Sequence, residues 1–223
     1  DLKLKFNAFY RETDNDNATY DTRMVGIIPA IEFPVSEMGR LELRAFAKES
    51  KLKDLYAGTA DDPTTPEDEF VLGTTPIIER DAERGALQSF GAGMSFIYDT
   101  RITGLNPKGG TLLRFGLDYA GLGGDIDSLT ANVMAMSETK VWNEDVTVRA
   151  VFEGGAIHMF NDENSRVTDR FFGSGKIRGF EPSGFGPRDL ASDDALGGNY
   201  YAVARLEAEF PIGDRRASCR ERV

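Results

Sequence analysis

The sequence predicts an all-β fold, an antiparallel sheet that forms part of a transmembrane β-barrel. Eight segments alternate apolar and polar residues with a period of two, which places successive side chains on opposite faces of a strand. Residues 145–160 exceed the length of about five or six residues usual in globular proteins, but they suit a tilted strand that crosses a bilayer. Longer and shorter connections alternate, as in outer-membrane barrels. Helical spacing is not sustained in any segment, so no helix is expected.

Among the first four predicted strands, the third has the clearest pattern. Its Leu41 and Leu43 alternate with Glu42 and Arg44, so one face is apolar and the other charged. The first, second and fourth strands alternate more weakly and complete the set. These four predicted strands span residues 2–10, 23–33, 40–48 and 86–98.

The fifth to eighth predicted strands separate apolar from polar residues more sharply. They span residues 111–119, 128–140, 146–160 and 199–210. Their apolar faces include Leu113, Phe115, Leu117, Leu129, Val133, Val148, Phe152, Tyr200 and Leu206. Their polar faces include Arg114, Asp118, Asn132, Glu138, Arg149, Glu153, Arg205 and Glu207. Parity alone does not say whether the apolar faces point to lipid or to a soluble core.

The connections between these strands fall into two classes. The longer class comprises residues 11–22, 52–83, 120–127 and 161–198, of which 120–127 is the weakest member. The shorter class comprises residues 34–39, 99–110 and 142–145. A soluble sandwich has no physical reason to sort its loops by side, whereas outer-membrane barrels have short periplasmic turns and longer extracellular loops. The alternation therefore favours a membrane barrel.

Composition narrows the functional classes. The net charge of −11 argues against a nucleic-acid partner, which would call for a basic face, and fits acidic loops or an acidic lumen. The single cysteine, Cys219, cannot form an internal disulfide. It lies in the abruptly basic "RASCRERV", which resembles read-through into a sequencing adapter. We therefore expect a partial barrel domain over residues 1–212 and a non-native tail within 213–223, from about Arg216.

Few residues suggest chemistry of their own. No His/Cys cluster predicts a metal site, and no phosphate-binding pattern is present. The only histidine, His158, falls on an apolar face without serine and acidic partners at matching height, so an interfacial side chain is favoured over catalysis. The sequence therefore predicts no catalytic residue, no metal and no cofactor.

Several motifs carry a family resemblance. The segments "FFGSGKIRGFEPSGFGPRD" and "ALGGNYYAVARLEAEFPI", and the turn "YDTRITGLNPKGG", resemble the barrels of the BamA family of the bacterial surface antigen superfamily. The segment "LRFGLDYAGLGGD" is similar to alphaproteobacterial members. The resemblance implies an incomplete barrel, about eight strands of a 16-stranded one, without the periplasmic POTRA domains.

The resemblance also implies a function. Members assemble β-barrel proteins in the bacterial outer membrane, without hydrolysis, by opening a seam that would lie outside these strands. The implied partners are nascent β-barrel proteins, accessory lipoproteins reached through the POTRA domains, and outer-membrane lipids. A TamA-type or two-partner secretion transporter is the nearest alternative, and a soluble ligand-binding β protein is a more distant one.

The site residues follow from the same resemblance. In the family, the Arg-Gly-Phe tip of a long loop folds into the lumen and meets an acidic wall. Here the tip is Ile177, Arg178, Gly179 and Phe180, and Glu207 on the charged face is the expected partner of Arg178. Gly179 would allow a positive φ, and Phe180 would fill an apolar gap. The turn motif, expected to be braced by hydrogen bonds, is Asp99, Arg101, Pro107 and Gly110.

Overall fold

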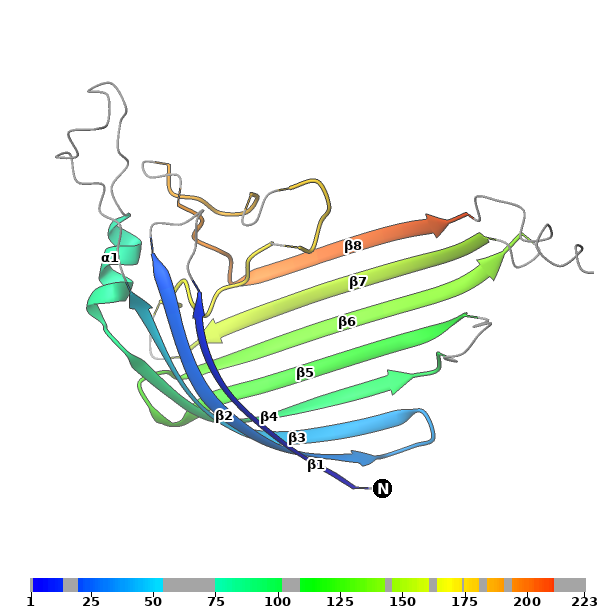
Figure 1. The fold of residues 1–223 in the computed structure, drawn as a ribbon, viewed down its shortest axis with the longest axis horizontal. Coiled ribbons are helices and arrows are strands. Elements are labelled where there is room, and N and C mark those ends of the chain that lie inside the picture. Colours follow the sequence, from blue (N-terminus) through cyan, green and yellow to red (C-terminus); the bar gives the residue numbers. More distant parts are fainter. Residues whose placement is uncertain are drawn as a thin grey trace, which may run out of the picture.

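The chain forms one antiparallel sheet in which the eight strands lie side by side in chain order (Figure 1). The computed structural model describes residues 2–13, 20–53, 75–101, 109–142, 146–160, 164–173, 175–180, 184–190 and 194–210. The strands are β1 (Lys3–Thr13), β2 (Asp21–Pro34), β3 (Gly39–Lys53), β4 (Leu87–Asp99), β5 (Gly109–Gly124), β6 (Ser128–Val141), β7 (Val146–Met159) and β8 (Tyr200–Glu209). All eight predicted strands are confirmed, and with them the all-β antiparallel fold class.

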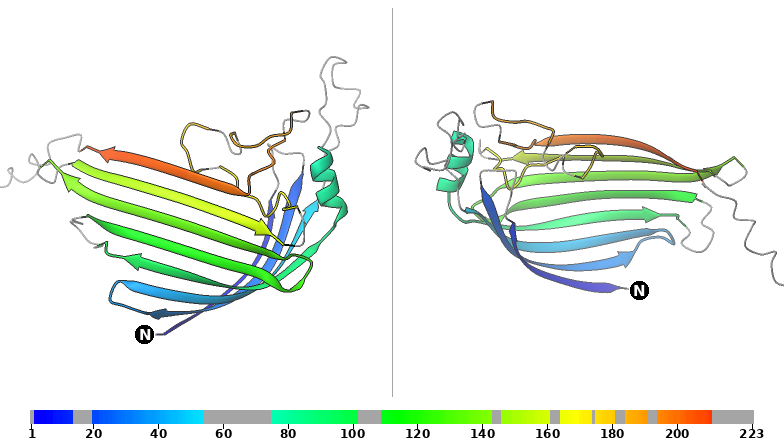
Figure 2. Two further views of the ribbon diagram at one scale, coloured as in Figure 1. Left: turned by 180° about the vertical axis from the view of Figure 1, so that it is seen from behind. Right: turned by 45° about the horizontal axis from the view of Figure 1, so that its top comes forward.

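The sheet is bent into an open trough, and the described parts of residues 164–198 lie over its concave side (Figures 1 and 2). Strand register fixes which side chains share a face. Phe115 of β5 lies opposite Val133 of β6, and Asp118 lies opposite Thr130 on the other face. We call the face of Asp118 the inner face, because the loop residues that follow β7 contact it, and the face of Phe115 the outer face.

The outer face is apolar and exposed. Phe115 is 44% exposed and Leu206 of β8 is 77% exposed, although both are large hydrophobic side chains. Other exposed outer-face residues are Leu4, Phe6, Ile27, Ile31, Leu43, Met94, Leu113, Val133 and Phe152. Most ion pairs between strands instead lie on the inner face, which is the reverse of a soluble barrel. Among the described strands, Arg23 with Glu49 and Lys53 with Glu12 are the exceptions: they lie on the outer face at one end of β1–β3. This arrangement favours lipid around the outer face.

Two expectations about the connections need correction. Strand β5 continues through Gly124, because Gly121, Gly123 and Gly124 adopt positive φ values that extend the hairpin, so only residues 125–127 join β5 to β6. The predicted connection at 120–127 was therefore too long. The alternation of long and short connections therefore breaks at β5. The connection before this strand, residues 100–108, is longer than the connection after it, residues 125–127.

A helix, α1 (Pro76–Glu83), lies within the predicted loop 52–83, so the expectation of no helix was wrong here. Thr75 caps it by accepting a hydrogen bond from Ile77 N at 3.3 Å, Pro76 occupies its first turn, and Gly85 follows its end with φ 71°. Eight residues are too few to show a sustained helical period. Among the described residues, no helix is long and apolar enough to cross a membrane.

The helix packs on the loop after β7 and forms a small core at one end of the sheet. Ile78 of α1 belongs to a buried cluster with Tyr20, Leu52 and Val167, which come from three other parts of the chain. Val167 N donates to Asp81 of α1 at 3.1 Å, and buried Arg166 donates to Ser50 of β3. We call α1 together with residues 164–173 the cap.

Candidate functional site

The predicted loop tip and its predicted acidic partner are brought together. Arg178 Nη2 lies 3.0 Å from Glu207 Oε1 on the inner face of β8. Glu207 also faces Arg149 of β7, whose Nη1 lies 3.6 Å from Oε2. The Arg178 side chain is nonetheless 89% exposed, so the expected shielding of this pair is absent among the described residues.

Of the other tip residues, Gly179 has the expected conformation, whereas Phe180 does not make the expected contact. Gly179 has φ 89°, a value that favours glycine. Phe180 does not fill a gap in the sheet: it is 56% exposed and its ring lies 5.1 Å from that of Phe185 within the same loop. Ile177 is also exposed. Aromatic contact inside the loop therefore takes the place of packing against the wall.

Sequence reasoning missed a second contact, just before the tip. Lys176 Nζ lies 3.3 Å from Glu153 Oε2 of β7 and 4.4 Å from the centre of the Tyr201 ring. Arg205 of β8 also pairs with Glu153 and donates to the Lys176 carbonyl at 3.1 Å. Glu153 and Arg205 were correctly placed on the polar face, but period-two patterns assign no partner to a loop lysine.

The turn motif is described except for Pro107, which lies outside the described residues. Arg101 donates to Asp99 through Nε at 2.9 Å, Nη2 at 2.8 Å and its backbone N at 3.0 Å. A Cβ on Gly110 would lie 2.7 Å from Arg101 Cα, so only glycine fits beside this pair. One carboxylate and one guanidinium thus brace the chain where it leaves β4, and Thr100 N, which donates to the Thr111 carbonyl at 2.9 Å, joins this end to β5.

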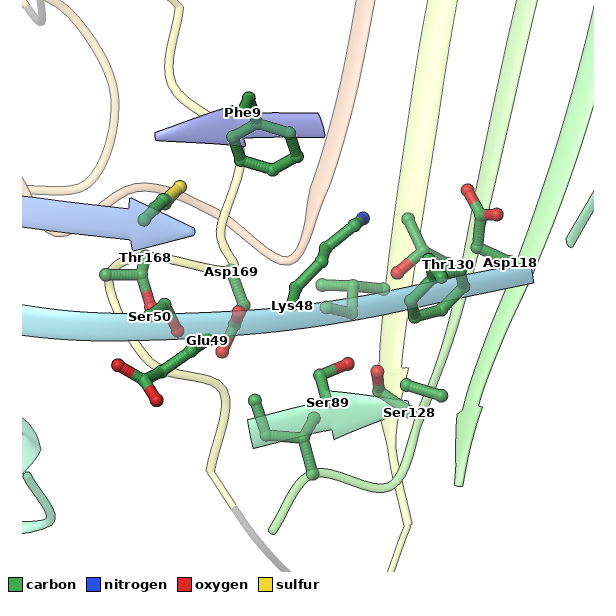
Figure 3. Close-up of a pocket in the computed structure, with 15 residues that line it drawn as sticks. Phe9, Lys48, Glu49, Ser50, Ser89, Asp118, Ser128, Thr130, Thr168 and Asp169 are labelled. Atoms are coloured by element: carbon green, nitrogen blue, oxygen red, sulfur yellow. The ribbon is translucent and has the colours of Figure 1, made fainter. Parts of the chain in front are cut away.

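A cavity of about 250 Å³ lies on the inner face beneath the cap (Figure 3). Lys48 of β3 points into it, with Nζ 4.5 Å from the centre of the Phe46 ring. Its remaining polar lining consists of Glu49, Ser50, Ser89, Asp118, Ser128, Thr130, Thr168 and Asp169. Among the described residues no group of three or more His, Cys, Asp or Glu side chains could hold a metal.

Burial perturbs several ionisable groups in the cap and beside it. Burial raises the pKa of the Tyr20 phenol, and the nearby carboxylates of Asp194 and Asp81 add to that rise. Burial also raises the pKa of the Asp169 carboxyl. The positive charge of Arg166, whose Nε lies 3.7 Å from Asp169 Oδ2, acts in the opposite direction. The same burial lowers the pKa of Arg166. The cap therefore holds charged groups at a cost in desolvation.

His158 lies on the outer face next to Phe160, whose ring meets the imidazole edge-on at 5.1 Å. Its paired residue on β6 is Leu129. This position agrees with the apolar face predicted from the sequence, and none of its described contacts supplies a nucleophile.

The sequence is similar to a known family and to individual proteins of known name. The Omp85 superfamily domain matches residues 1–220. Outer membrane protein assembly factor BamA of Neorickettsia risticii is 34% identical over 106 residues, 48% of this chain and 14% of that protein. The human sorting and assembly machinery component 50 homolog is 30% identical over 121 residues, 53% of this chain and 25% of that protein.

A solved structure shares the fold. The crystal structure of BamA from Haemophilus ducreyi lacking POTRA domains 1–3 superposes with a TM-score of 0.74 at 18% identity. The match covers 96% of this chain and 43% of that one. The matched regions thus span from about a seventh to less than half of these relatives.

Proposed function

The chain belongs to the Omp85 superfamily, and on that premise we propose that it forms part of a bacterial outer-membrane β-barrel that folds and inserts other β-barrel proteins. The exposed apolar outer face is the observation that carries this proposal. Such a face is unfavourable in water and favourable in lipid, whereas the ion-paired inner face suits a polar lumen.

The relatives support assembly over secretion. One is named as an outer membrane protein assembly factor and others as sorting and assembly machinery components. A secretion transporter of the TamA or two-partner type would share a barrel of this kind, so the fold alone does not separate the two activities.

The proposed partners are unfolded β-barrel proteins, accessory lipoproteins bound through periplasmic domains, and the lipids of the outer membrane. Residues 1–212 would contribute the barrel wall and the loop that lies within it. The tail after about Arg216 would contribute nothing, and residues 211–223 lie outside the described part of the chain.

The proposed mechanism involves no covalent chemistry. The outer face holds the wall in lipid, and cross-strand hydrogen bonds keep the sheet intact. The inner ion pairs, such as that of Arg178 with Glu207, hold the long loop against the wall. The described strands would thereby form a part of the barrel that stays closed while a seam between other strands opens.

Depletion of the protein in the bacterium that carries it tests this proposal. Folded β-barrel proteins should fall in the outer membrane, and plasmid-borne wild-type protein should restore them, while inner-membrane proteins stay constant. Unchanged β-barrel proteins together with loss of one secreted protein would instead identify a secretion transporter.

A further inference from the structure

We propose that Lys176, two residues before the predicted Arg178, positions the tip of the long loop against the inner wall more strongly than Arg178 does. This inference deepens the role given to the loop above and rests on that proposed function for its biological meaning. Lys176 is held by both its side chain and its backbone.

The side chain of Lys176 lies between a carboxylate and an aromatic ring. Its ammonium is 3.3 Å from Glu153 and 4.4 Å from the centre of the Tyr201 ring. The ion pair and the cation–π contact act on the same charge, and both partners lie on the inner face, where β7 and β8 are paired. The neighbouring strands β7 and β8 therefore each supply one contact to the Lys176 side chain.

Tyr201 is itself fixed in place. A Cβ on Gly155 of β7 would lie 2.4 Å from Tyr201 Cε1, so the ring lies directly over this glycine. The Phe171 ring packs against it from the loop, with centres 4.8 Å apart. The aromatic surface under Lys176 is thus held by the wall on one side and by the loop on the other.

The backbone at Lys176 is held by the same wall. Arg205 Nη1 donates to the Lys176 carbonyl at 3.1 Å, and its Nη2 pairs with Glu153. Arg205 thus binds both the Glu153 carboxylate, which holds the Lys176 side chain, and the Lys176 backbone carbonyl. A guanidinium suits this role because its donors point in fixed directions.

Burial distinguishes this contact from the one at Arg178. The side chains of Lys176 and Glu153 are 25% and 17% exposed, against 89% and 34% for Arg178 and Glu207. Exposed ion pairs contribute little because water and salt screen them, whereas partly buried pairs are screened less. The loop should therefore depend more on Lys176 than on Arg178.

Spin labelling of the purified full chain tests this directly. Nitroxides are placed at Phe180→Cys in the loop and Leu206→Cys on the outer face of β8, with Cys219→Ser to avoid a third label. Their distance distribution is compared for the parent, Lys176→Met, Lys176→Arg and Arg178→Met, with Lys53→Met as a control cation at a distant ion pair. Folding of each variant is checked by its heat-dependent gel mobility.

We expect Lys176→Met to broaden the distance distribution markedly, Arg178→Met to broaden it less, and Lys176→Arg and Lys53→Met to leave it as in the parent. Glu153→Gln, which removes the other charge, should broaden it as Lys176→Met does. A narrow distribution in both Lys176→Met and Glu153→Gln, or greater broadening in Arg178→Met, would overturn the inference. The distance reports loop position irrespective of insertion activity, so failure of the proposed function would leave this result readable.

Discussion

Arg44 and Asp118 form a two-bond ion pair that reaches across β4, the strand between theirs. Arg44 Nε and Nη2 lie 2.8 and 2.7 Å from the two carboxylate oxygens of Asp118. Gly93 of β4 is paired with Arg44 on one side and with Asp118 on the other. A Cβ at position 93 would lie 1.9 Å from Asp118 Oδ1, so the ion pair requires glycine beneath it.

Gly93→Ala should therefore separate Arg44 from Asp118 and lower the free energy of unfolding in detergent by about 1.5 to 3 kcal/mol, the range for hydrogen bonds to charged groups. Gly116→Ala on the same face is the matched control, because its Cβ would lie 3.5 Å from Ser95 Oγ, an ordinary contact. Denaturant titration of both variants measures the difference. Equal losses in the two variants would contradict this role for Gly93.

The features predicted correctly from the sequence are those that depend on the two-residue period of a strand. The eight strands and their two faces follow from alternation, because each strand must present one side to each environment. The α1 helix was missed because it is only eight residues long, although Thr75, Pro76 and Gly85 mark its ends. Loop contacts such as Arg166 with Ser50 join distant parts of the chain and leave no periodic trace. Arg178 with Glu207 was predicted through a family motif, and Lys176 had no such motif to mark it.

Charge reversal tests the tip contact. Arg178→Glu should place two carboxylates together at Glu207 and reduce the amount of folded protein in the outer membrane. Adding Glu207→Arg should restore part of that amount, although Arg149 then faces a second cation. Because Arg178 is largely exposed, neutral Arg178→Ala should cost less than about 1 kcal/mol of stability. Normal assembly of the Arg178→Glu protein would show that this contact is dispensable.

The cap should respond to pH through Asp169. Burial raises the pKa of this carboxyl above its ordinary value, so its contribution to stability is fully present below the ordinary pKa. That contribution is lost as the pH rises through the raised value. Amides of residues 164–173, corrected for intrinsic exchange, should be better protected at acidic than at neutral pH.

Asp169→Asn should remove this pH dependence, because the amide does not titrate. Glu79→Gln on the exposed side of α1 is the control and should leave the dependence in place. Equal pH dependence in the parent and in Asp169→Asn would assign the effect to another group of the cap.

Collision accessibility along β5 tests whether the outer face meets lipid and the inner face meets water. Single nitroxides are placed at residues 113 to 118 in the chain reconstituted in lipid vesicles, with Cys219→Ser as background. We expect lipid-dissolved oxygen to reach residues 113, 115 and 117, and a water-soluble nickel complex to reach residues 114, 116 and 118. Equal access of the nickel complex to both sets would contradict a membrane-facing outer surface.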